Sequence, residues 1–299
     1  MDMLRIEGLY KRFGDKEVLR GLELSVPEHS IFGFIGKNGS GKTTTMKTVL
    51  GLLRADAGKI TVNGEEVTYG ENKTNRFIGY LPDVPEFYSF MTAKEYLIFC
   101  GEISGMKKSE SAARADELLS LVGLIGEEHR IKGFSRGMKQ RLGIAQALLG
   151  RPKLLICDEP SSALDPVGRK EILDILSAVR KETTVLFSTH ILSDVERICT
   201  DIAFLDEGVT RACGTLSDIK ACYGRKEYLI ETENEEDARV LTEAFPLLYE
   251  REHKTLCFEE NELSPFAVME VLAKNRIIPL RFERTEATLE ALFTEVKEK

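Results

Sequence analysis

Ten consecutive residues, GKNGSGKTTT at positions 36–45, combine three glycines, two lysines and hydroxyl side chains, and they follow the apolar run Ile31–Ile35. Glycines let successive backbone amides turn towards one point, and a helix that follows adds unpaired amides and the positive end of its dipole. Threonine is a mediocre helix former, so helix propensity does not explain three threonines in a row. The match to G-x-x-x-x-G-K-T over residues 36–43 is that of a P-loop and predicts a site for a polyphosphate.

The side chains of this loop have separate expected tasks. Lys42 would reach the β- and γ-phosphates of a nucleotide, the Thr43 hydroxyl would bind Mg²⁺, and Thr44 would donate to an α- or β-phosphate oxygen. The remaining contacts would come from the loop itself, through Gly36, Asn38, Gly39, Ser40 and Gly41. A glycine-rich turn that only caps a helix is the alternative, and the complete motif after a strand disfavours it.

A second group of chemically active residues follows the apolar run Leu154–Cys157, which ends in Asp158 and Glu159. Carboxylates at a strand end beside a phosphate site are unfavourable unless they meet a cation, so Asp158 is the expected partner of Mg²⁺, directly or through water. Glu159 is then placed to orient or deprotonate a water that attacks the γ-phosphate. A solvated turn is the alternative for such an acid pair when no P-loop precedes it.

Further segments carry a resemblance to a known family. Residues 134–141, FSRGMKQR, resemble the LSGGQ signature of ABC ATPases, and Ser161–Asp165 resembles the D-loop of that family. Ser188–His190 is similar to the segment with its switch histidine, and Phe13 matches the aromatic residue that stacks on adenine. Together with the P-loop and the acid pair, these motifs follow the order of the family from residue 1 to about residue 220.

The resemblance implies ATP and Mg²⁺ as ligands and ATP hydrolysis as the reaction, with Lys42, Glu159 and His190 as the catalytic residues. It also implies a head-to-tail dimer, homodimer or heterodimer, in which ATP lies between the P-loop of one copy and Ser135 and Gly137 of the other. Ser135 is itself a good helix N-cap, so the signature helix would present a second anion-binding end. ATP would hold the dimer together and hydrolysis would loosen it.

Some of these residues have local alternatives. Asp165 before Pro166 is also a good helix cap with a first-turn proline. His190 could be a polar strand end rather than a γ-phosphate ligand, and Phe13 could belong to the core rather than to an adenine site. The family usually has glutamine where this chain has Asp83, and an acid there could still bind Mg²⁺ or water while adding negative charge. The expected metal ligands are Thr43, Asp158 and Asp83.

These residues must be positioned by alternating strands and helices. The predicted strands of this part are Leu4–Ile6, Val18–Val26, Ile31–Ile35, Gly58–Val62, Phe77–Leu81, Leu154–Cys157, Thr184–Ser188 and Ile202–Leu205. The predicted helices between them are Lys42–Leu53, Pro166–Arg180 and Ile191–Cys199. This order predicts an α/β fold: a P-loop ATPase core over residues 1–222, with a mostly parallel sheet and an N-terminal antiparallel β region. Residues 92–150 show helical patterns alone and form a predicted helical subdomain.

Residues 223–299 read as a smaller accessory α+β domain. The order is strand, helix, two strands, helix and strand, which suggests a ferredoxin-like module. Ser264-Pro265 is a good helix start. A last helix is expected near the end of the chain, where Leu289, Leu292, Phe293 and Val296 would form one apolar stripe.

Composition excludes several classes of protein. The net charge of −8 comes from the end of the chain, because residues 225–299 hold 11 Lys/Arg against 18 Asp/Glu. A basic face for nucleic acid is therefore not expected. No apolar run is long enough to span a membrane and no export signal precedes the first strand, so we expect a cytoplasmic protein. The six cysteines lack metal-site spacing and are expected to be buried free thiols.

An ATPase without a membrane span must pass its motion to a partner. The insertion at 92–150 is too short for the coiled coil of chromosome-maintenance relatives, and one cassette is present where translation factors carry two. The expected partner is a separate transmembrane permease, which would hold the chain on the inner face of the cell membrane. The signature, the segment Tyr80–Asp83 and the segment Thr288–Phe293 resemble the drug, antibiotic and polysaccharide export branch. A soluble ABC ATPase acting on a ribosome or nucleic acid, an importer ATPase and a P-loop kinase are the alternatives.

Overall fold

A computed structural model of the protein describes residues 2–71, 73–223, 227–252, 254–285 and 289. The chain divides into two compact units, Met1–Ser217 and Asp218–Lys299. The strands are β1 (Asp2–Phe13), β2 (Lys16–Pro27), β3 (Ile31–Ile35), β4 (Ala57–Val62), β5 (Glu65–Glu66), β6 (Ile78–Leu81), β7 (Leu154–Cys157), β8 (Thr184–Thr189), β9 (Asp201–Asp206), β10 (Val209–Thr215), β11 (Glu227–Glu231), β12 (Tyr249–Glu252), β13 (Thr255–Glu259) and β14 (Arg281–Thr285). The α-helices are α1 (Lys42–Val49), α2 (Ala93–Ile103), α3 (Lys108–Leu121), α4 (Arg136–Ala147), α5 (Pro166–Val179), α6 (Leu192–Ile198), α7 (Leu216–Tyr223), α8 (Glu235–Ala244) and α9 (Pro265–Lys274).

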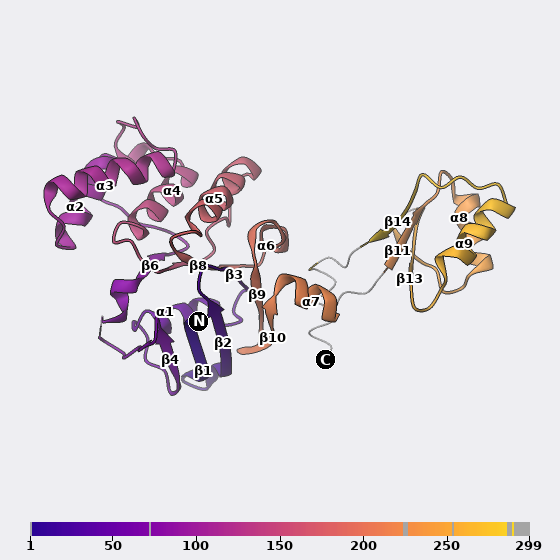
Figure 1. Ribbon diagram of the computed structural model, residues 1–299, viewed down its shortest axis with the longest axis horizontal. Coiled ribbons are helices and arrows are strands. Elements are labelled where there is room, and N and C mark those ends of the chain that lie inside the picture. The colour runs from indigo at the N-terminus through magenta and orange to yellow at the C-terminus, as the bar shows by residue number, and fades with distance from the viewer. Residues whose placement is uncertain (1, 72, 224–226, 253, 286–288, 290–299) are drawn as a thin grey trace. The chain divides into compact units, whose positions relative to one another are not determined.

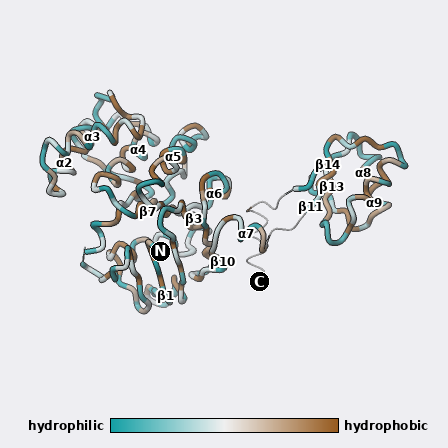
Figure 2. The backbone as a smooth tube through the Cα atoms, viewed as in Figure 1, coloured by the Kyte–Doolittle hydropathy of each residue, from teal (hydrophilic) through white to brown (hydrophobic). Residues whose placement is uncertain are grey.

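The main sheet of the first unit has the strand order β10-β9-β3-β8-β7-β6. Neighbours from β9 to β6 are parallel, and β10 is an antiparallel edge strand. Strands β3 and β7 are apolar (Figure 2), and they are buried along their whole length, as expected of parallel strands covered on both faces. The predicted α/β fold with a mostly parallel sheet is confirmed.

A second, antiparallel sheet has the order β2-β1-β4-β5 and forms the predicted N-terminal β region. One core fills the space between it and the main sheet, with Leu4, Leu22 and Ile60 from the antiparallel side and Phe34 from β3. Helix α1 contributes Met46 to the same core. The helix that carries the P-loop lysine is therefore fixed by packing on both sheets.

Helices α2, α3 and α4 lie together on the side of the main sheet away from the antiparallel sheet (Figure 1). Helix α2 begins with a capping box, in which the Thr92 hydroxyl accepts from the Glu95 amide and the Glu95 carboxylate accepts from the Thr92 amide. These hydrogen bonds hold the pKa of Glu95 below its usual value. Helix α4 packs on β6, so the predicted helical subdomain reaches the sheet through the helix that carries the signature.

The second unit contains an antiparallel sheet of order β12-β13-β11-β14. With α8 after β11 and α9 after β13, this is the β-α-β-β-α-β arrangement of a ferredoxin-like module. Its own core includes Ile230, Leu241, Phe258 and Val268. Helix α9 starts at Pro265 after Ser264, as predicted, although the Ser264 side chain does not accept a cap hydrogen bond.

Some expectations were wrong or fall outside the described residues. Strands β5 and β10 and helix α7 were not predicted. The six cysteines are free, but Cys213 and Cys222 are exposed rather than buried. Of the predicted last helix, only Leu289 is described, and it is buried; Leu292, Phe293 and Val296 lie outside the described residues.

Candidate functional site

Four parallel strands end at one edge of the main sheet. Ile35 of β3 is level with Thr189 of β8, and Cys157 of β7 is level with Leu81 of β6. The P-loop, the acid pair, Asp83 and His190 directly follow these strand ends, so the register brings together segments that lie far apart in sequence. In open α/β sheets this carboxyl edge is where ligands bind.

The P-loop connects β3 to α1 without a side-chain cap on the helix. Gly41 is the N-cap residue and has φ 112°, a value that L side chains rarely adopt. A Cβ on Gly41 would also lie 2.7 Å from Leu19 Cδ2, and a Cβ on Gly36 would lie 2.6 Å from the Leu205 carbonyl oxygen. These glycines are thus required by conformation and by space, and the first amides of α1 are left for an anion.

Lys42 is folded back along the loop, with 5% of its side chain exposed. Its Nζ donates to the Gly36 carbonyl at 2.6 Å and lies 3.2 Å from Glu159 Oε1. The contact with Glu159 is an ion pair without hydrogen-bond geometry, since Oε1 has no hydrogen-bond donor among the described residues. A phosphate in the site would compete with Glu159 for this cation.

The three threonines use their hydroxyls differently. Thr43 Oγ1 donates to Asp158 Oδ2 at 2.7 Å, and Thr44 lines the hollow above the loop. Thr45 is buried and donates to the Gly41 carbonyl at 3.0 Å. The positions of Thr43 and Thr44 suit ligand binding, whereas Thr45 closes the first turn of its own helix.

Asp158 is 4% exposed, and its carboxylate accepts from two neutral hydroxyls, Thr43 Oγ1 and Ser188 Oγ, each at 2.7 Å. Within the described residues it has no ion pair, and a buried carboxylate without a cation is unfavourable. A hydroxyl beside a carboxylate is also a donor set that Mg²⁺ prefers. These residues therefore fit a Mg²⁺ ion. No group of three or more His, Cys, Asp or Glu in the described ranges could hold a metal alone.

Glu159 contacts two other candidate catalytic residues. Its Oε1 lies beside Lys42, and its Oε2 lies 2.8 Å from His190 Nδ1. Glu159 has φ 49°, a left-handed conformation that costs about 1–2 kcal/mol for a residue with a Cβ. Such strain at a strand end aims the carboxylate along the sheet edge rather than into solvent, so only 14% of the side chain is exposed.

Asp83 follows β6 and lines the same hollow. Its Oδ1 accepts from the Ser162 hydroxyl at 3.1 Å and lies 3.7 Å from Arg136 Nη2, and its carbonyl accepts from the Gln140 amide at 2.7 Å. Asp83 thus contacts the D-loop segment and the first turns of α4. Nearby, burial, aided by the charge of Asp158, raises the pKa of Tyr80 to about 12, so that its phenol stays neutral.

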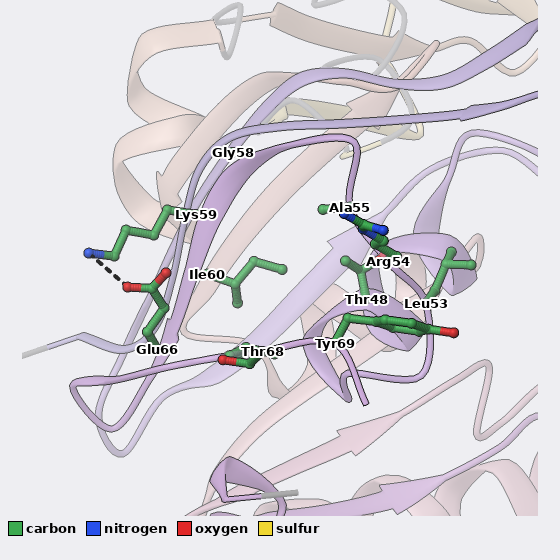
Figure 3. A pocket seen from close by; sticks show the side chains of 11 residues that line it. Thr48, Leu53, Arg54, Ala55, Gly58, Lys59, Ile60, Glu66, Thr68 and Tyr69 are labelled. Carbon is green, nitrogen blue, oxygen red and sulfur yellow. Dashed lines mark ion pairs between the residues drawn. The ribbon is translucent and has the colours of Figure 1, made fainter. Parts of the chain in front are cut away.

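The hollow at the sheet edge has a volume of about 480 Å³. Predicted residues line most of it: Asn38, Gly39, Gly41, Lys42, Thr43, Thr44, Asp83, Asp158 and Glu159. Lys16 and Val18 of β2 also line it and were missed, because nothing in their local pattern separates them from an ordinary strand. Another hollow of about 390 Å³ lies beside β4 and is lined by Arg54, the Lys59–Glu66 ion pair and Tyr69 (Figure 3), but by none of the predicted residues.

Phe13 lies at the end of β1, 48% exposed, with Lys11 Nζ 5.3 Å from its ring centre. The alternative that Phe13 belongs to the core is therefore wrong. Phe13 does not line the hollow in this structure, so stacking on adenine stays a prediction.

Ser135 caps α4, since its Oγ accepts from the Met138 amide at 3.2 Å. Asp165 caps α5 in the same way, with Pro166 in the first turn. The expected local role of Asp165 as a helix cap is therefore confirmed. A Cβ on Gly137 would meet nothing closer than Ser135 Oγ at 4.0 Å. The chain itself therefore does not require glycine there, although glycine weakens a helix by roughly 0.5–1 kcal/mol. Neither Ser135 nor Gly137 lines the P-loop hollow.

Known proteins are similar to this chain in sequence and in fold. A family model described as ABC transporter matches residues 19–162. The ABC transporter ATP-binding protein YxlF of Bacillus subtilis (strain 168) is 45% identical over 73% of this chain and 72% of its own length. This chain belongs to the ABC transporter ATP-binding proteins. As a member of this family, the ABC ATPase binds and hydrolyses ATP.

Two further comparisons agree. The bacitracin transport ATP-binding protein BcrA of Bacillus licheniformis is 40% identical over 69% of this ABC ATPase and 67% of its own length. A solved structure of the ATP-binding subunit of an ABC transporter superposes with a TM-score of 0.66 and 32% identity, over 74% of this chain and 93% of the other. In the described part of the ABC ATPase, no helix is long and apolar enough to cross a membrane.

Proposed function

We propose that this ABC ATPase energises an exporter through ATP bound at the carboxyl edge of the main sheet. The observation that carries the proposal is the hollow above the P-loop, where Lys42 and Glu159 lie beside the Thr43–Asp158 pair. His190 does not line this hollow but contacts Glu159 from outside it. The SRGMKQR signature and the similarity to a bacitracin transport protein support export as the direction.

The residues of the hollow divide the chemistry. Lys42 and the amides of Gly39 and Gly41 bind the phosphates, and Glu159 orients the attacking water and takes its proton. His190 holds the Glu159 carboxylate from the exposed side and can turn to the γ-phosphate. Thr43 and Asp158 would hold a Mg²⁺ ion, with Asp83 in the same hollow, and the ion would supply positive charge to the phosphate oxygens.

The second half of the ATP site comes from another copy of the chain. Ser135 and Gly137 present the start of α4 outside the P-loop hollow, and a helix start is a site for an anion. In the proposed head-to-tail dimer, each ATP lies between the P-loop of one copy and this helix start of the other. Phe13 would stack on the adenine ring.

The permease is proposed to dock on the segment between β6 and α2. Val84, Tyr88 and Phe90 are 64%, 52% and 62% exposed, and the rings of Tyr88 and Phe99 pack edge to face with centres 5.6 Å apart. An exposed apolar patch of this kind suits a helix from a membrane partner. The chain would then sit on the cytoplasmic face of the membrane.

The domain assignment remains part of the proposal. We assign residues 1–222 to the ATPase domain, with the helical subdomain at about 92–150, and residues 223–299 to the accessory domain. Helix α7 spans Leu216–Tyr223 and thus crosses the division of the two compact units after Ser217.

Affinity capture tests the partner. Tagged Glu159→Gln protein, loaded with ATP and taken from detergent-solubilised cells, should retain a polytopic membrane protein. The same protein with Phe90→Asp as well should lose that partner, while a matched Phe266→Asp change on the exposed face of α9 should not. Capture of ribosomal proteins or DNA instead, independent of Phe90, would contradict the transport role.

A further inference from the structure

Ser188 lies at the carboxyl end of β8, two residues before His190, and its side chain is completely buried. His190 directly follows this strand, which ends at Thr189. Ser188 and His190 both contact residues that follow β7: Ser188 contacts Asp158 and Glu159, and His190 contacts Glu159. One strand end thus supplies two side chains to the acid pair of its neighbour.

The Ser188 hydroxyl uses its donor and an acceptor at the same time. It donates to Asp158 Oδ1 at 2.7 Å and accepts from the Glu159 backbone amide at 2.9 Å. The other oxygen of Asp158 accepts from Thr43. Each oxygen of the Asp158 carboxylate therefore has a hydroxyl partner, which fixes the plane of the carboxylate.

The same hydroxyl also acts on the strained residue Glu159. Its amide donates to Ser188 while its φ is 49°, so this hydrogen bond is one of the contacts that hold the left-handed conformation. A hydrogen bond to a charged group is stronger than one between neutral groups, so the Ser188–Asp158 contact is strong enough to select an orientation.

We propose that Ser188 is a positioning residue for the Mg²⁺-nucleotide site, orienting Asp158 towards the metal and fixing the backbone that aims Glu159. This inference rests on the proposed roles of Asp158 and Glu159. Partners that orient metal ligands typically change metal affinity or activity by about 10–100-fold when removed.

ADP is the probe, because it is not hydrolysed and its binding can be measured with and without the metal. Isothermal titration calorimetry gives the affinity for ADP in EDTA and in Mg²⁺, and the ratio of the two reports the metal. In Ser188→Ala the affinity for ADP in EDTA should be unchanged. The factor by which Mg²⁺ increases the affinity for ADP, called the gain from Mg²⁺ below, should fall by about tenfold. Thermal unfolding of each variant shows that it is folded.

Ser30→Ala is the matched control. Ser30 is also a buried serine of the main sheet region, 3% exposed, and donates to the Pro27 carbonyl at 2.7 Å, but it precedes β3 at the opposite edge. This variant should lose a comparable hydrogen bond and keep the full gain from Mg²⁺.

The outcomes separate this inference from the proposed function. A Ser188→Ala protein with the wild-type gain from Mg²⁺ would overturn the role of Ser188, even if its melting temperature fell. A wild-type protein without any gain from Mg²⁺ would overturn the metal site itself. If Ser188→Ala does not fold, Ser188→Cys, which keeps the volume and weakens the donor, is measured with the same expectation.

Discussion

Among the single residues of the site, Glu159 has a charged or polar neighbour at each of its two carboxylate oxygens. Lys42 Nζ lies 3.2 Å from one oxygen of Glu159, and His190 Nδ1 lies 2.8 Å from the other. The Glu159 carboxylate thus lies between two side chains, the buried Lys42 and the half-exposed His190. A γ-phosphate that attracts Lys42 would free one oxygen of Glu159 for water.

Glu159→Gln keeps the shape of this side chain and removes its ability to take a proton. Turnover should fall by about 10²–10⁴-fold, the usual contribution of a positioned base. Affinity for ATP should stay, because Glu159 does not bind the nucleotide. Phosphate release and equilibrium ATP binding check the two halves of this prediction. Glu182→Gln, an exposed acid before β8, is the control and should turn over normally; brisk hydrolysis by Glu159→Gln would contradict the assignment.

Asp83→Ala should slow turnover and leave ATP binding largely intact. The variant loses the Ser162 hydrogen bond and the Arg136 ion pair, whose side chains are about half exposed. Stability should therefore change by less than about 1 kcal/mol. Asp174→Ala, which removes an exposed ion pair with Arg197 on α6, is the control. Equal steady-state rates for both variants would remove Asp83 from the mechanism.

Among the elements, α4 starts with a cap that the structure shows and is proposed to face the ATP of a second copy, and one substitution can separate these two roles. Aspartate caps a helix as well as serine does, but its charge repels an anion at the same place. Ser135→Asp should therefore keep the melting temperature and abolish the ATP-dependent dimer. Ser135→Ala should lose about 1 kcal/mol of stability, since it removes the cap.

A matched cap elsewhere controls for the added charge. Asn234 caps α8 through a 2.8 Å hydrogen bond from the Asp237 amide. Asn234→Asp should keep both stability and the dimer. Sedimentation with ATP measures the assembly of each variant, and a dimer of undiminished affinity in Ser135→Asp would show that this helix start does not face a phosphate.

Elements with a strong local signal were predictable from the sequence. The bounds of β3 and β7 match the prediction, and α9 starts at Pro265 as expected from Ser264-Pro265. Strand β10 was missed because VTRACGT does not alternate polar and apolar residues. The sequence signal was Gly208, which lies with Glu207 in a two-residue hairpin turn where both have positive φ, 81° and 46°.

The contacts within the site were less predictable than its members. The P-loop and the acid pair are local motifs, so Thr43 and Asp158 could be named from sequence. The contact of Ser188 with Asp158 depends on the register of β7 and β8, which pairs Cys157 with Phe187. Register is a tertiary property, set by packing on both faces of the sheet. The position of Phe13 relative to the hollow was unpredictable for a similar reason, because it depends on the conformation at the end of the β1–β2 hairpin.

At the scale of the whole molecule, the two compact units have separate cores. Phe258 is completely buried in the core of the second unit, and Phe258→Ala should destabilise that unit by about 3–5 kcal/mol. ADP affinity should not change, because every residue of the hollow belongs to the first unit. Calorimetry with and without ADP checks this, with Phe34→Ala in β3 as the variant that should weaken ADP binding. Loss of ADP binding in Phe258→Ala would contradict the independence of the units.

In the proposed dimer, one ATP site is built from two copies of the chain. Lys42→Met leaves the start of α4 intact but disables the P-loop, and Ser135→Asp does the reverse. Each variant alone should be inactive, whereas a mixed dimer contains one complete site.

The test mixes the two purified variants and measures ATP hydrolysis. The mixture should hydrolyse ATP at a rate well above the sum of the separate proteins, and this rate should rise with the concentration of either partner. A mixture no faster than that sum, or a Ser135→Asp protein that hydrolyses ATP alone as a monomer, would contradict the proposed dimer.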